Sequence, residues 1–175
     1  LIKIIIDHEN FPTASHLEFA RMLKGDNRLA AAKRYLEETK TNQKLPWSNE
    51  LIDLLEIIPE ENLLSVLRQQ WPNHGLRPAI LKRLVKQPKE QDRALLLDAL
   101  LSRDNSLSKT ALNALKELPA SNNPKELTPL IRKLRRECGP KGKAEIRKKI
   151  LALLTTWSGH KFKKIQKFIW LILMV

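Results

Sequence analysis

The sequence predicts an all-α fold, an α-solenoid of antiparallel helix pairs, and two observations carry this prediction. First, apolar residues recur eight, seven and four positions before three prolines that lie about 30 residues apart, a period typical of stacked helical repeats. Second, aromatic residues make up only 5% of the chain, leucine is abundant, and no alternating strand pattern interrupts the series. We therefore expect about five helix pairs. The prolines are Pro59, Pro88 and Pro119, preceded by Leu51, Ile52 and Leu55, by Ile80, Leu81 and Leu84, and by Ala111, Leu112 and Leu115.

Local signals place the helices in the first half of the chain. Ser15 with Glu18 three residues later matches a capping box, and Gly25 suits the left-handed residue that closes a helix. Pro59 and Pro88 suit a first helical turn, where the missing N–H costs nothing. A Trp-Pro pair followed by a glycine turn ends another helix. The helices expected here cover residues 14–24, 27–40, 48–58, 60–70 and 77–86.

In the second half, polar or glycine-containing breaks at 104–105, 120–123 and 139–140 separate the helices. Residues 95–101 are apolar on nearly all sides, as expected for an inner helix that is covered by its neighbours. Two later helices each carry one apolar stripe, formed by Leu127, Leu130, Ile131, Leu134 and Cys138 and by Ile146, Ile150, Leu154 and Trp157. The helices expected here cover residues 89–102, 106–117, 124–138, 143–157 and 161–173.

We expect a single helical-repeat domain over residues 1–175, with the clearest repeats at 48–158. The chain begins at Leu1 rather than at methionine, so we interpret it as a piece of a longer protein. Residues 159–175 form a terminal basic and apolar segment. Its apolar run is shorter than the about 20 residues that a membrane span needs, so we expect packing on the array. Membrane contact of 165–175 is the alternative.

Positive charge is concentrated in the second half of the chain. The net charge is +13, and the first 75 residues contain more Asp and Glu than Lys and Arg. Cations on adjacent repeats could bind an acidic protein, or could follow a nucleic-acid backbone by releasing counterions. The third possibility is that these cations only form a solvated surface that keeps the protein soluble. No aromatic residues for base stacking are interleaved with them. The candidate binding residues are Lys125, Arg132, Arg136, Lys141, Lys143, Lys148 and Lys149.

No pattern for catalysis or for a cofactor is present. The loop at 139–143 lacks the spacing of a phosphate-binding loop, and the four histidines are scattered. Cys138 lies on an apolar stripe, so we expect a buried and unreactive thiol. We therefore expect no catalytic residue, no metal site, no cofactor and no small-molecule substrate.

The repeat resembles HEAT-type (armadillo-like) repeats, in which two antiparallel helices with leucine-rich stripes meet near a proline. This resemblance covers about residues 14–158 and implies a non-catalytic protein-interaction or scaffold module. HEAT-like DNA-repair enzymes would imply base excision, but no catalytic carboxylate facing a basic groove can be placed here.

Three stretches resemble more narrowly the HEAT region of large planctomycete-type proteins. They are GLRPAILKRL (75–84), DRALLLDALLS (92–102) and LLTTWSGHKF (153–162). Those exported proteins join a β-propeller dehydrogenase-like domain, HEAT repeats and a c-type cytochrome domain. The resemblance implies a spacer or docking surface in a periplasmic multidomain redox protein. This chain has no C-x-x-C-H motif, so no haem-binding residue is carried over.

Overall fold

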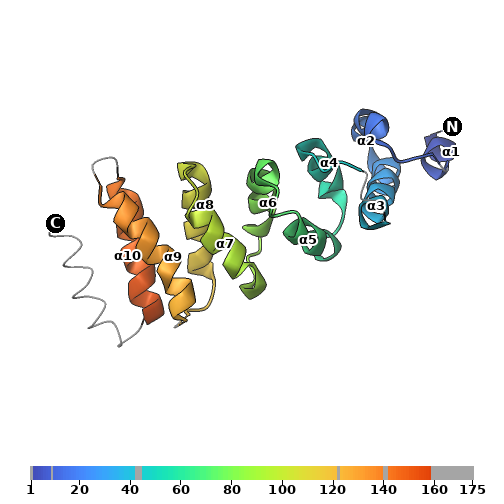
Figure 1. Cartoon of the computed structure of the whole chain (residues 1–175). Coiled ribbons are helices and arrows are strands. Elements are labelled where there is room, and N and C mark those ends of the chain that lie inside the picture. The colour runs from blue at the N-terminus through green and yellow to red at the C-terminus, as the bar shows by residue number, and fades with distance from the viewer. Residues whose placement is uncertain (1, 9, 42–44, 122, 140–141, 159–175) are drawn as a thin grey trace. The chain divides into compact units, whose positions relative to one another are not determined.

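The computed structural model describes residues 2–8, 10–41, 45–121, 123–139 and 142–158 (Figure 1). Every regular element among these residues is a helix, which confirms the all-α prediction. The helix expected at 161–173, and the whole segment 159–175, lie outside the described residues. The chain divides into two compact units, Leu1–Ile80 and Leu81–Val175, and the division falls within one helix. The single repeat domain expected over 1–175 stays a prediction.

The first unit is built around its longest helix. This helix packs against two shorter α-helices and a 3-10 turn, and it buries Ala31, Ala32 and Tyr35. The Tyr35 hydroxyl donates a 2.7 Å hydrogen bond to the carbonyl of Thr13, and its ring meets Phe11 edge-on. The elements are α1 (Ile2–Asp7), η1 (Ala14–His16), α2 (Leu17–Met22), α3 (Gly25–Thr41), α4 (Asn49–Leu54), η2 (Leu55–Ile57), α5 (Glu60–Gln69), η3 (His74–Leu76) and α6 (Arg77–Leu84).

Two features near the N-terminus differ from the sequence prediction. Helix α1 was not expected, because the spacing of its isoleucines fits a helix and a strand equally well over so short a segment. The capping box was also wrong: the Ser15 hydroxyl shares a hydrogen bond with Thr13, and α2 begins only after a 3-10 turn. Gly25 has the left-handed backbone conformation that was expected, with φ of 54°.

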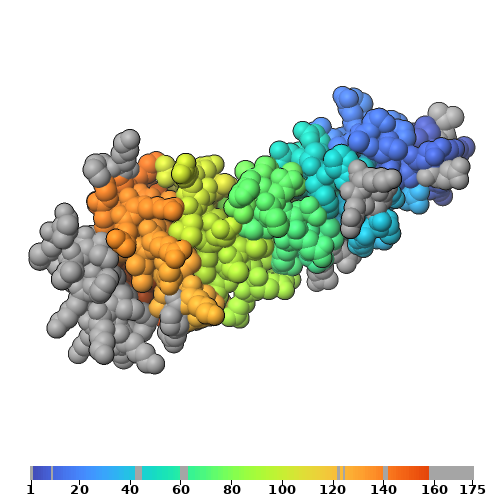
Figure 2. Space-filling model, viewed as in Figure 1, coloured from blue at the N-terminus to red at the C-terminus, as the bar shows by residue number. Residues whose placement is uncertain are grey.

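Among its described residues, the second unit contains four complete α-helices, and these contact one another in a closed cycle. Helix α7 packs against α8 and α9, and α10 packs against the same two helices. In the space-filling view, the orange surface of α9 and α10 adjoins the yellow-green surface of α7 and α8 (Figure 2). Their bounds are η4 (Glu90–Asp92), α7 (Arg93–Leu100), α8 (Asn105–Glu117), α9 (Pro124–Glu137) and α10 (Ala144–Ser158).

Helices α8 and α9 of the second unit begin with side-chain caps. The Asp104 carboxylate accepts a hydrogen bond from the N–H of Ser106 at 2.8 Å, and the Asn123 side chain accepts one from the N–H of Lys125 at 3.0 Å. These caps satisfy N–H groups that have no partner inside the helix. They confirm two of the breaks that the sequence predicted.

The two apolar stripes of the second unit are mostly buried, and Ile131 of α9 is only partly buried. Leu127, Leu130 and Leu134 of α9 are buried, and so are the four stripe residues of α10. Cys138 is only half-buried, because it stands at the end of α9 beyond the packed part of the stripe. The expectation of a buried thiol is therefore wrong.

Candidate functional site

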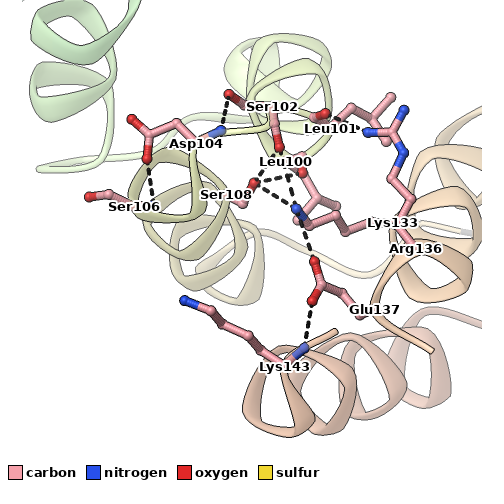
Figure 3. A network of polar contacts seen from close by, with 10 residues as sticks. All are labelled: Leu100, Leu101, Ser102, Asp104, Ser106, Ser108, Lys133, Arg136, Glu137 and Lys143. Carbon is pink, nitrogen blue, oxygen red and sulfur yellow. Dashed lines mark hydrogen bonds and ion pairs between the residues drawn. The ribbon is translucent and has the colours of Figure 1, made fainter. Parts of the chain in front are cut away.

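A buried polar cluster fixes α9 against the ends of its neighbours (Figure 3). The ammonium of Lys133 donates to the hydroxyl of Ser108 at 3.0 Å and lies 3.2 Å from a carboxylate oxygen of Glu137. The Ser108 hydroxyl is 3.0 Å from the carbonyl of Leu100, and the other Glu137 oxygen accepts from the N–H of Lys143 at 2.8 Å. One cluster thus joins α7, α8, α9 and the residue that precedes α10.

Sequence reasoning missed this cluster. Lys133 and Glu137 were not among the candidate residues, yet both are buried. A buried charge is costly unless it is paired and hydrogen-bonded, and here each partner meets that condition. The available signal was their spacing of four residues alongside the apolar stripe of α9, which allows an ion pair on one helix face.

Arg93 is a second cation that the fold places in its interior. Its side chain is 6% exposed, and it donates to the carbonyl of Pro119 at 2.9 Å. It lies 3.4 Å from a carboxylate oxygen of Glu126, and its guanidinium lies over the ring of Trp157, 4.8 Å from the centroid. Arg93 therefore links the start of α7 to α9, to α10 and to the connection before α9.

Three of the candidate cations lie on one face of α9. Lys125, Arg132 and Arg136 are exposed and project from the side opposite the leucine stripe. Arg136 extends toward α7 and donates to the carbonyl of Leu101 at 2.8 Å. We call these three residues the α9 basic face. It lies on the side of the unit where α9 contacts α7.

The remaining candidates in the described part of the chain lie outside the α9 basic face. Lys149 lies 3.0 Å from Glu145 on α10, and Glu145 also lies 3.3 Å from Lys109 on α8. Hydrogen bonding to these two cations lowers the pKa of Glu145. Lys148 is exposed on the same helix, and Lys143 is exposed just before it. Lys141 lies outside the described residues. The structure therefore groups Lys125, Arg132 and Arg136 on α9, places Lys149 where α10 faces α8, and leaves Lys143 and Lys148 as exposed cations without a shared contact.

The acidic residues of this unit do little to neutralise its surface. The segment 81–175 contains 22 Lys or Arg residues and 8 Asp or Glu residues. Seven of those carboxylates interact within the protein, among them the buried Glu137. By contrast, Arg132, Arg135 and Lys148 form no ion pair with any described residue. The surface of this unit therefore carries an excess of positive charge.

An open groove runs between α7 and α9, beside the α9 basic face. Its volume is about 340 Å³. Four of its lining residues are apolar or small and three are charged. They are Ala94, Leu97, Leu101 and Pro129, with Asp98, Lys125 and Glu126.

Other kinds of site find little support in the described part of the chain. Those residues contain no group of three His, Cys, Asp or Glu side chains placed to hold a metal ion. No helix among them has both the length and the apolar character to cross a membrane. An apolar pocket of about 320 Å³ beside α1 is lined by His8 and His16, the only titratable side chains among its described lining residues.

Comparison with known proteins identifies no relative. No family model, no curated protein and no solved structure matches this chain.

Proposed function

We propose that the protein is a non-catalytic interaction module of HEAT-like helix pairs that binds an acidic protein partner through the α9 basic face. The observation that carries the proposal is the charge imbalance of the second unit. Most of its carboxylates already interact with other groups of the same chain, whereas Arg132 has no ion pair with a described residue. Complementary charge attracts a partner and orients it, and an acidic surface is the natural complement here.

The contacts in the second unit support the repeat interpretation. Consecutive helices pack as α7 with α8 and α9 with α10, while α7 also contacts α9 and α8 also contacts α10. Such a pattern is expected when each two-helix repeat stacks on the next. We propose that the pairs are antiparallel and that the stacked helices present the binding face.

A nucleic acid is the second candidate partner. The spacing of Lys125, Arg132 and Arg136 favours it, because these side chains lie on one side of a single helix and could each meet a phosphate. Two features favour a protein instead. Asp98 and Glu126 line the groove next to Lys125, and α9 contains no aromatic side chain for base stacking.

Direct binding distinguishes the two candidates. The affinity of the protein for a labelled Asp/Glu-rich peptide and for a labelled oligonucleotide of equal charge is measured by fluorescence anisotropy, at about 50 and about 200 mM salt. The variant carrying Arg132→Ala and Arg136→Ala is compared with one carrying Lys116→Ala and Lys148→Ala. The control residues are exposed cations of α8 and α10, so both variants lose the same charge.

We expect the peptide to bind, and the first variant to bind it about tenfold more weakly, since two exposed ion pairs together contribute about 1–2 kcal/mol. The control variant should keep nearly full affinity. Absence of peptide binding at the lower salt concentration would contradict the proposal. If only the oligonucleotide bound, the partner would be a nucleic acid and not an acidic protein.

A further inference from the structure

We infer that the groove between α7 and α9 holds an apolar side chain of the acidic partner, while the carboxylates of that partner meet the α9 basic face. This inference rests on the proposed function and adds to it the form of the ligand. The ligand is a peptide segment in which one apolar residue stands among acidic residues.

The floor and size of the groove suit a side chain better than a metabolite. Leu97 and Pro129 provide apolar surface from the two helices, and Ala94 leaves open space on α7 because its side chain is a single methyl group. Pockets for small molecules extend from about 300 to 1,000 Å³ and enclose most of the ligand. At about 340 Å³ this open groove is at the small end of that range, which fits one large apolar side chain with its backbone left outside.

The polar groups at the rim match a peptide rather than a phosphate backbone. Lys125 lines the groove and offers an ammonium to a carboxylate, with Arg132 two turns further along the same face. Pro129 has no N–H, so it cannot donate to the carbonyl of Lys125 four residues earlier in the helix. A peptide can supply an N–H to that carbonyl, whereas phosphate groups supply only acceptors.

The charges that line the groove point to the same ligand. Asp98 and Glu126 would repel a phosphate placed over the groove, but they leave an uncharged apolar side chain unaffected. The ligand must therefore be neutral where it enters the groove and acidic where it passes along α9. An acidic segment with an apolar anchor has this arrangement, and a uniformly charged polymer does not.

The test uses two labelled peptides that differ at one position. One has the sequence Glu-Glu-Glu-Leu-Glu-Glu-Glu, and in the other serine replaces leucine. Their dissociation constants are measured on the native protein, on Ala94→Trp and on Ala152→Trp. Ala94 lines the groove, so tryptophan there fills it, whereas Ala152 is an exposed alanine of α10 outside the groove.

We expect the native protein and Ala152→Trp to bind the leucine peptide about tenfold more tightly than the serine peptide, because the groove buries part of a leucine side chain. Ala94→Trp should bind both peptides equally. Circular dichroism of both variants establishes that each is folded.

Equal binding of both peptides by the native protein would overturn the inference. If the double variant Arg132→Ala and Arg136→Ala then bound both peptides more weakly than the native protein, the proposed function would be retained and only the role of the groove would be wrong. A preference for leucine that survives in Ala94→Trp would equally overturn the inference. If neither peptide bound the native protein, both the proposed function and this inference would be wrong.

Discussion

Replacing Lys133 by alanine tests whether the buried cluster of the second unit holds its helices together. The side chains of Lys133 and Glu137 are 4% and 8% exposed, and their charged atoms are 3.2 Å apart. At an effective dielectric constant of about 20, that separation corresponds to an attraction of about 5 kcal/mol. Desolvation of both groups offsets much of this attraction in the native protein. The variant retains the buried carboxylate without its partner, so we expect a loss of about 3–5 kcal/mol in the free energy of unfolding.

Urea denaturation followed by circular dichroism measures this loss. The matched control is Arg132→Ala, which removes an adjacent but exposed cation from the same helix and should cost less than about 0.5 kcal/mol. A second variant, Lys133→Met with Glu137→Leu, removes both charges and keeps apolar bulk, and it should recover most of the stability. If Lys133→Ala cost no more than Arg132→Ala, the cluster would not be a buried, mutually dependent pair.

Two further predictions concern titration. Burial raises the pKa of Tyr35, the only tyrosine of the chain, so ultraviolet absorbance reports its ionisation without interference from other tyrosines. The pKa of Tyr35 is higher in the folded protein than in the unfolded chain. Its contribution to the free energy of unfolding is therefore complete below about pH 10 and declines as the pH rises beyond that value. We expect the phenolate to appear together with unfolding, and ionisation of the folded protein near pH 10 would contradict this. For Glu145, the lowered pKa means that its stabilising contribution is present above the ordinary carboxyl range and is lost as the pH falls through the folded value. In an NMR titration, Lys149→Ala should raise the pKa of Glu145, and an unchanged value would exclude the ion pair in solution.

Periodicity in the sequence predicted the helices well, because a repeating apolar stripe has few alternatives to packing against a neighbour. The stripe of α9 and the cap at Asn123 are local features that one helix determines by itself. The start of α2 and the half-burial of Cys138 depend on neighbouring segments, and these two expectations were wrong.

The candidate surface was predictable only in part, for a related reason. Helical spacing places Lys125, Arg132 and Arg136 on one face of α9. It does not reveal that Lys149 shares its partner Glu145 with Lys109 of α8, because that depends on which helices lie side by side. The same holds for Arg93, which looks like an ordinary surface cation near Glu90 until the packing is known. Its contacts with Pro119 and Trp157 join residues that are distant in the sequence.

The contacts of Arg93 have a consequence for synthesis on the ribosome. Its carbonyl partner at Pro119 is 26 residues later in the chain, and the ring of Trp157 is later still. At the usual elongation rates of about 5–20 residues per second, Arg93 waits about 3–13 s before Trp157 has been added. Helices α7 and α8 therefore emerge while Arg93 has only its neighbour Glu90, 3.3 Å away, as a partner and still lacks those that surround it in the interior. Completion of the second unit is delayed until α10 has left the exit tunnel, so nascent chains truncated before Trp157 should be more sensitive to protease than those that include it.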